Sequence, residues 1–324
     1  MNPKTKKIQN ARSQNQGFAL IDLLAVIAVV AALAVTLLPA LAGSRPNSQA
    51  FQCQNNQRQI VRAWQMYAED CNDLLPPNDF YSGGGTGSTT PYNGPSRVEG
   101  TGRAPNWNWV GGAMDQRVNN SEATNTMDLT TDAALGFYCT NASVYHCPAD
   151  NSVVSGIGPR VRSVSMNCAV GTLWNTAPPL GGGGVGCAQG NPVGPTWLSG
   201  SWAGTCGNNT AWQTYGKLSS ISKPSPANFF VITDENPNSI NDPVLMVAMG
   251  TPDANGNATE NELIDIPASY HNGACGFAFA DGHSEIHKWL GTVLDGAPKN
   301  DTEMTTTLDI SDLRWLQART SATQ

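Results

Sequence analysis

Residues 18–42 read FALIDLLAVIAVVAALAVTLLPALA, a run of 25 residues in which Asp22 is the only charged side chain. The 17 residues before it contain four basic side chains and no acidic one. An apolar helix of about 20 residues is long enough to cross a bilayer. Basic residues on its N-terminal side favour keeping that end in the cytoplasm. The stretch therefore predicts a single-pass helix with a cytoplasmic N-terminus and an extracytoplasmic head.

Two other interpretations compete for this stretch. A secretory signal peptide is one, because Ala40-Leu41-Ala42 would supply small residues for cleavage before Gly43. Its apolar segment, however, would be only about 7–15 residues long. A simple membrane anchor is the other, but a carboxylate such as that of Asp22 is costly inside a bilayer and usually has a role there.

The start of the run resembles the type IV prepilin signature. In that family a basic leader ends in Gly, the next residue is usually Phe, and an acid stands five positions after the cut. The matching residues are Gly17, Phe18 and Asp22, although the acid of the family is nearly always Glu. The resemblance implies that residues 1–17 are a leader, which a prepilin peptidase cleaves between Gly17 and Phe18 before methylating the new amine.

The resemblance further implies that residues 18–45 form an inner-membrane and filament-core helix. An unpaired carboxylate in lipid is unfavourable, and the N-terminal amine of a neighbouring subunit would neutralise Asp22 during assembly. Pro39 is expected to kink the helix, as a proline does in pilin helices. The implied partners are the prepilin peptidase, the inner membrane and other pilin-like subunits.

An amphipathic helix is expected to follow over residues 46–75. One stripe recurs at steps of three and four residues; it consists of Cys53, Gln57, Ile60, Trp64, Tyr67 and Cys71. Asn72 and the prolines at 76 and 77 end the pattern. The pattern is consistent with one helix that continues from the apolar run. It is equally consistent with two helices that are separated by a break at residues 43–46.

Residues 76–295 predict a β-rich head with long loops rich in Gly, Asn and Trp. Strands are expected at residues 136–140, 143–147, 161–167, 229–233, 244–248, 276–280 and 283–289. The lack of βαβ alternation favours an antiparallel sheet. Residues 296–324 are expected to be a polar tail with a short helix. The predicted fold class is α+β, with a long N-terminal membrane-spanning helix packed on an antiparallel head, as in pilins.

A hairpin is expected around Asp281-Gly282, a dipeptide typical of a two-residue type I′ turn. Such a turn pairs Phe279 with Ser284 and Phe277 with Ile286. One face would then hold Phe277, Phe279 and Ile286, and the other would hold His283, Glu285, His287 and Trp289.

Nine residues separate His271 from Asp281-Gly282. This spacing resembles the prepilin-type processing-associated H-X9-DG domain. The blocks at 146–150, at 160–167 and at Asp234-Glu235 resemble further motifs of the same pilin-like proteins. Adjacent strand residues point to opposite faces, so we do not expect Asp234 and Glu235 to act as a carboxylate pair.

Two groups of side chains are candidate metal ligands. The possible zinc ligands are His271, Asp281, His283 and His287, for which a polar sheet face with a turn-forming Asp is the simpler interpretation. The other group, Asp253, Asn255 and Asn257, alternates like the oxygen ligands of a calcium loop. Its glycine is displaced and no Glu stands at the twelfth position, so a solvated loop is the simpler interpretation.

The eight cysteines suit an oxidising, extracytoplasmic compartment. Cys53 and Cys71 would be about 27 Å apart on one helix, too far to pair. The first expected disulfide joins Cys139 to Cys147, which flank a possible tight turn. The second joins Cys187 to Cys206 in the glycine-rich loops.

Composition and motifs narrow the function. The net charge is −7 and no basic cluster follows the first dozen residues, so a nucleic-acid partner is not expected. No nucleophile elbow, phosphate loop or dinucleotide fingerprint occurs in the sequence, and we expect no enzymatic activity. The resemblance implies a structural subunit of a type II secretion pseudopilus or type IV pilus-like filament. The alternative is a membrane-tethered protein whose Trp-rich loops bind polysaccharide.

Overall fold

The computed structural model describes residues 20–78, 108–114, 121–172, 192–193, 198, 211–296 and 302–324. The chain divides into two compact units, Met1–Arg45 and Pro46–Gln324. The predicted processing residues Gly17 and Phe18 lie outside the described residues, as do Cys187 and Cys206.

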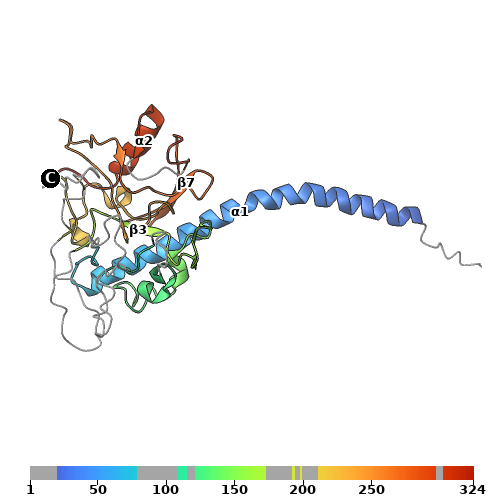
Figure 1. Cartoon of the computed structure of the whole chain (residues 1–324), viewed down its shortest axis with the longest axis horizontal. Helices are drawn as coiled ribbons and strands as arrows, with labels where there is room; N and C mark the ends of the chain where they lie inside the picture. The colour runs from blue at the N-terminus through green and yellow to red at the C-terminus, as the bar shows by residue number, and fades with distance from the viewer. Residues whose placement is uncertain are drawn as a thin grey trace, which may run out of the picture. The chain divides into compact units, whose positions relative to one another are not determined.

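The N-terminal helix α1 covers Leu20–Asp70, so it spans most of the predicted ranges 18–45 and 46–75 as one helix (Figure 1). The backbone of Asp22 and Pro39 lies within it, but their side chains fall outside the described part. The helix ends just before Asn72 and Asp73, whose φ angles of 53° and 74° are left-handed. Among the described side chains, no helix combines the length and the apolar character needed to cross a membrane.

The second half of α1 is the central helix of the head. The predicted stripe is buried, as expected, and its apolar members join one hydrophobic core with residues of the strands β3, β4 and β7. The stripe therefore forms the face that packs against the rest of the head.

A five-stranded sheet lies at the centre of the head. Its strands are β3 (Val164–Asn167), β4 (Phe230–Asp234), β5 (Val244–Leu245), β7 (Ala274–Phe279) and β8 (Ser284–Lys288). The order is β5-β3-β4-β7-β8. Neighbours are antiparallel except β3 and β5, which are parallel. The α+β class is confirmed, but the sheet is mixed and not purely antiparallel.

Shorter elements surround the sheet. Two small sheets pair β1 (Val153–Val154) with β2 (Gly158–Pro159), and β6 (Glu262–Leu263) with β9 (Thr302–Glu303). The short 3-10 helices are η1 (Ser121–Thr124), η2 (Thr126–Leu129), η3 (Ala142–Tyr145), η5 (Leu218–Ser220) and η6 (Pro226–Asn228). The C-terminal helix α2 covers Thr307–Gln317.

The two α-helices contact opposite faces of the central sheet. Ser284 donates a hydrogen bond to the carbonyl of Gln54 on α1 (3.0 Å), and Gly276 lies against Cys53 of the same helix. The ring of Phe277 packs instead on Trp315 of α2, with centroids 4.9 Å apart. Because side chains alternate along a strand, the neighbours Gly276 and Phe277 face different helices.

The predicted hairpin is present, but its register differs by one residue. Ala278 pairs with Ser284 and Phe277 with Glu285, and the Phe279 N–H donates to the carbonyl of His283 (2.9 Å). Residues 280–282 therefore form a three-residue turn, which Gly282 completes at φ +94°. Glycine in a left-handed position is typical of such turns.

The register shift reverses the predicted faces of β8, because a slip of one residue moves every side chain to the other side. Phe277 and Phe279 share their face with the histidines and not with Ile286. The rings of Phe279 and His283 stack at 4.3 Å, and Phe277 lies 6.4 Å from His287. The face of β8 that was predicted to be polar, with His283 and His287, therefore lies against aromatic rings.

Three further predictions were wrong. Residues 143–147 begin within the 3-10 helix η3 and form no strand, because the Asn141 side chain accepts a hydrogen bond from the Ser143 N–H and caps the turn (3.1 Å). The predicted strand at 136–140 is a turn. The C-terminal segment is no free polar tail: Leu313 and Leu316 are fully buried, and the Arg319 carbonyl accepts from the Phe230 N–H of β4 (3.1 Å).

Candidate functional site

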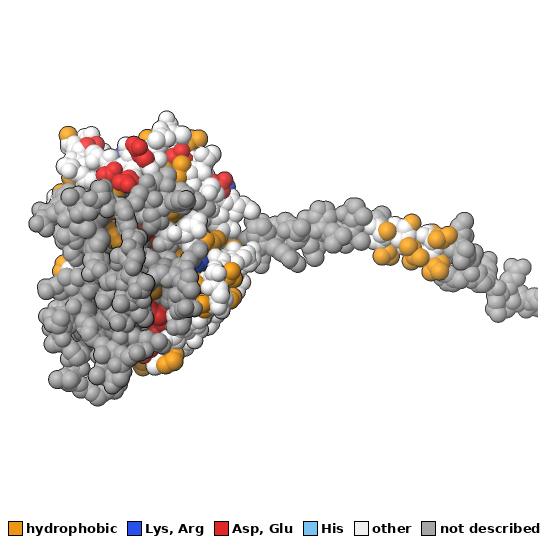
Figure 2. Space-filling model, viewed as in Figure 1, with side chains coloured by type: hydrophobic (Ala, Val, Ile, Leu, Met, Phe, Trp, Pro, Cys, Tyr) orange, Lys and Arg blue, Asp and Glu red, His pale blue; other side chains and the backbone are white. Residues whose placement is uncertain are grey.

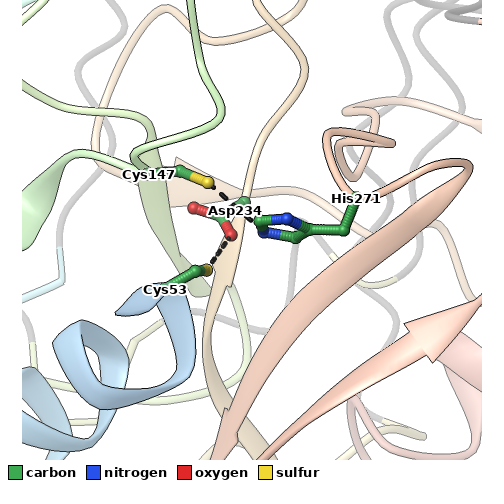
Figure 3. Close-up of side chains that lie close together, drawn as sticks. All are labelled: Cys53, Cys147, Asp234 and His271. Atoms are coloured by element: carbon green, nitrogen blue, oxygen red, sulfur yellow. Dashed lines mark hydrogen bonds between the residues drawn. The ribbon is translucent and has the colours of Figure 1, made fainter. Parts of the chain in front are cut away.

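Four buried side chains come together in the head: Cys53, Cys147, Asp234 and His271, which we call the donor cluster. Their sulfur, oxygen and nitrogen atoms all lie within 4.8 Å of one another (Figure 3). Each comes from a different segment. Cys53 lies on α1, Cys147 follows η3, Asp234 ends β4, and His271 precedes β7.

Two contacts within the cluster are short. The Cys53 thiol donates to Asp234 Oδ2 at 2.9 Å, and Cys147 Sγ lies 3.4 Å from His271 Nε2. Two outer residues hold the carboxylate. Gln57 Nε2 donates to Asp234 Oδ2 (3.1 Å), and Ser163 Oγ donates to Asp234 Oδ1 (3.3 Å).

The backbone brings these side chains into place. Ser163 Oγ also accepts from the Cys147 N–H at 2.7 Å, which ties the segment after η3 to the start of β3. On the other side, the His271 N–H donates to the Ala274 carbonyl (3.1 Å). Asn272 and Gly273, both with left-handed φ, form the tight turn between them.

Gly276 is the residue that lets α1 approach the cluster. A Cβ placed there would lie 2.7 Å from Gln57 Nε2, 2.8 Å from Cys53 Sγ and 2.9 Å from Asp234 Oδ2. These separations are shorter than real Cβ contacts, so any larger residue would push the helix or the donors away. Glycine at this point of β7 keeps the cluster compact.

Burial favours the uncharged form of the cluster. It raises the pKa of Asp234 to about 7 and lowers that of His271. The pKa of Cys53 is raised by its hydrogen bond with Cys147 and by burial. At Cys147 the hydrogen bond with Cys53 lowers the pKa, but burial and the nearby Asp234 raise it by more. A cation among the donors would reverse this balance by favouring thiolates and carboxylate.

The predicted zinc ligands do not form one group among the described residues. His271 alone lies in the donor cluster. Asp281 Oδ1 and His283 Nδ1 contact each other at 2.6 Å in the exposed hairpin turn. His287 stacks on Trp315 with centroids 3.5 Å apart. Of the four predicted zinc ligands, His271 is therefore the one that lies among other possible metal donors.

The predicted calcium loop is closed by its own hydrogen bonds. Asp253 Oδ1 accepts from the N–H groups of Asn255 and Asn257, each at 2.8 Å, and Oδ2 accepts from Asn257 Nδ2 at 3.0 Å. These bonds use the carboxylate oxygens that a cation would need, in agreement with a solvated loop.

The predicted Cys139–Cys147 disulfide is not formed, because both residues are free thiols. Burial raises the pKa of the Cys139 thiol, whereas the sulfur of Cys147 turns to the donor cluster. Cys71 is disulfide-bonded, and its partner is none of the five free cysteines that the structure describes. The predicted lack of a Cys53–Cys71 pair is confirmed.

The described tryptophans of the long loops are structural. Trp109 and Trp212 are buried, and their indole N–H groups donate to the carbonyls of Pro243 (3.2 Å) and Gly250 (2.7 Å). Trp212 also lines a pocket of about 860 Å³ together with Met249, Asp253 and Arg314. Trp107, Trp174, Trp197 and Trp202 lie outside the described residues.

Each member of the donor cluster belongs to a pattern that is visible in the sequence. Cys53 is part of the helix stripe, Cys147 and Asp234 lie in short blocks, and His271 begins the H-X9-DG spacing. No local spacing indicates that the four would meet. Comparisons with family models, with curated proteins and with solved structures found no match to this chain.

Proposed function

We propose that this chain is a pilin-like or pseudopilin structural subunit. A prepilin peptidase trims it after Gly17, and it assembles through α1 into a type II secretion pseudopilus or a type IV pilus-like filament. The head remains outside the inner membrane, and we assign it no catalytic activity.

The observation that carries this proposal is the exposed apolar surface of α1 in the first unit. Residues 23–31 are all apolar and all exposed, and the large side chains among them are 54–59% exposed. Figure 2 shows these hydrophobic side chains gathered along the described part of that segment. A helix that is apolar on all sides belongs in lipid or in a protein core, and a filament core of packed helices supplies such surroundings.

The second support is that α1 is shared between the two units. Its residues from Pro46 onward belong to the unit that contains the head, and its earlier residues belong to the other. A helix that is anchored in the head by a buried stripe, and whose apolar residues 23–31 are exposed, suits a subunit of a helical filament.

The polysaccharide-binding alternative receives no support from the described tryptophans. Trp109 and Trp212 are buried and donate hydrogen bonds within the head, and the other loop tryptophans lie outside the described residues. Filament assembly therefore remains the better supported function.

Processing is the first test. We expect the full-length chain, expressed with a prepilin peptidase, to yield a mature protein that begins at N-methylated Phe18. Mass analysis of the N-terminal peptide measures this directly, and a strain without the peptidase is the control. A mature chain that begins at Gly43 would instead identify an ordinary signal peptide and overturn the proposal.

Assembly is the second test, through Asp22. Asp22→Ala should leave membrane insertion intact, because it removes a costly carboxylate from lipid. Cleavage after Gly17 should also persist, because by resemblance the peptidase reads chiefly the glycine and its flanking residues. Incorporation into sheared filaments should fall, because the incoming amine loses its partner and a buried unpaired charge is costly. Asp22→Glu keeps the charge and is the matched control. Equal incorporation of Asp22→Ala and wild type would show that Asp22 does not guide assembly.

A further inference from the structure

We propose that the donor cluster binds one zinc ion, which fastens α1 to the central sheet of the head. Cys53, Cys147, Asp234 and His271 are the four ligands. This site does not depend on the filament function, because all four residues and their supports lie within the unit Pro46–Gln324.

The spacing of the donors fits tetrahedral coordination. Zinc binds sulfur at about 2.3 Å and nitrogen or oxygen at about 2.0–2.2 Å, so the ligand atoms of a tetrahedral site lie about 3.3–3.8 Å apart. Cys147 Sγ and His271 Nε2 are already 3.4 Å apart. Cys53 Sγ and Asp234 Oδ2, at 2.9 Å, would separate by about half an ångström once the shared thiol proton leaves.

The types of donor select zinc over calcium. Calcium takes six to eight oxygen ligands, whereas the cluster offers two sulfurs, one imidazole nitrogen and one carboxylate. Thiolates and imidazoles are the ligands of structural zinc sites. Four protein donors fill a tetrahedral shell, so the site is structural and leaves no open position for a substrate.

Outer residues already orient the ligands, as they do in metal sites. Gln57 and Ser163 each donate a hydrogen bond to Asp234, and the Ser163 hydroxyl accepts from the Cys147 N–H. The close approach at Gly276 leaves the space for the donors to meet. Nε2 of His271 faces the cluster, so the imidazole proton would stay on Nδ1.

The site keeps a net charge of −1 when the cation enters and the protons leave. Two thiolates, one carboxylate and Zn²⁺ sum to −1, and the donors Gln57 and Ser163 face this residual negative charge. Binding releases the two thiol protons, together with the carboxyl proton where Asp234 holds one. No oxidant or reductant takes part.

A Cys53–Cys147 disulfide is the competing chemistry at the same place, since the two sulfurs lie within 4.8 Å. It would use both thiols but leave unexplained why a buried carboxylate and an imidazole converge on them. Zinc accounts for all four side chains.

The test measures zinc and thiols in the full-length protein, purified without added metal from cells grown with zinc. We expect about one zinc ion per chain in the wild type and its loss in Cys147→Ser. Cys168→Ser is the matched control, because Cys168 is also a buried free thiol but lies outside the cluster. His283→Ala and His287→Ala should likewise retain zinc, which separates this site from a histidine site on the hairpin.

A measurement on the wild type alone covers the case in which Cys147→Ser fails to fold. X-ray absorption at the zinc edge should count two sulfur ligands, with nitrogen or oxygen as the others. Zinc with fewer than two sulfurs would overturn the proposal. Wild-type protein without zinc would also overturn it, and a Cys53–Cys147 peptide in non-reducing mapping would then identify the disulfide.

Discussion

Gly276 lies in β7 beside the donor cluster, and the fold depends on its having no side chain. The space that a Cβ would need is occupied by Gln57 and Cys53 of α1 and by Asp234 of β4. Protein interiors are close-packed, so even one added methyl group has to displace its neighbours. The contact between helix and sheet is therefore sensitive to a single carbon atom.

We predict that Gly276→Ala lowers the free energy of unfolding by about 1–3 kcal/mol, the usual cost of overpacking a core. Urea unfolding monitored by tryptophan fluorescence measures it. Cys53→Ala removes one of the clashing atoms, so the double variant should lose less stability than the sum of the two single variants. Simple additivity would show that Cys53 does not limit the space at Gly276.

The helix α2 and the strand β8 form an aromatic layer on the other face of the sheet. His287 of β8 stacks on Trp315 of α2, and Arg319 lies over the same indole, 4.2 Å from its centroid. Burial and the positive charge of Arg319 lower the pKa of His287 to about 4. Glu285 is the nearby acid. Its negative charge raises the pKa of Arg319, whereas burial lowers it.

The contribution of this element to stability should fall in mild acid, whereas the raised pKa values of the buried Asp234 and Glu235 contribute in the opposite direction over the same range. The unfolded chain binds a proton at His287 near its ordinary pKa of about 6.5, whereas the folded chain binds it only near 4. The unfolded state thus holds more protons between these values. The contribution of His287 is complete above about pH 6.5 and is lost as the pH falls toward 4.

His287→Phe, which keeps a ring against Trp315 but cannot titrate, should gain stability relative to the wild type as the pH falls from about 6.5 to 4, because the contribution of His287 to the slope is removed. Arg319→Gln removes a positive charge beside His287, so the pKa of His287 in the folded chain should rise above about 4. The pH range over which His287 changes the stability should then be narrower at its lower limit. Unfolding series at several pH values measure both effects. An unchanged slope in His287→Phe would show that another group carries the acid sensitivity.

Local patterns predicted the two α-helices and the five strands of the central sheet, but not the shorter elements or how the elements combine. The apolar run of β4, the alternation in the hairpin of β7 and β8, and the stripe of α1 are all visible in the sequence. The hairpin register was missed because Gly282 suits a three-residue turn as well as a two-residue one. The strand predicted at 143–147 failed because the side chain of Asn141, outside the predicted strand, caps a helical turn.

The candidate site could not be predicted from local patterns, because its four side chains come from separate segments of the chain. His271 was predicted as a ligand, yet its partners come from α1, from the segment after η3 and from the end of β4. They meet only because β4 and β7 are neighbours in the sheet and α1 crosses that point. The order of strands is a property of the whole fold, and no spacing between residues in the sequence contains it.

At the scale of the whole molecule, the unit Pro46–Gln324 is expected to fold without the residues before it. A chain reduced to residues 46–324 should keep the cooperative thermal unfolding of the head. Removal of residues 302–324 should abolish it, because Leu313 and Leu316 are buried and Trp315 packs on Phe277. Circular dichroism and limited proteolysis compare the two truncations. A protease-resistant head without residues 302–324 would contradict this prediction.

The donor cluster joins residue 53 to residue 271, and this separation orders its assembly in time. Synthesis proceeds from the N-terminus at about 5–20 residues per second, so Cys147 emerges roughly ten seconds before His271. The zinc site is therefore incomplete until residue 271 has been made, and only then can the metal fasten α1 to the central sheet. Most of the head has to be synthesised before its first long helix is held in place.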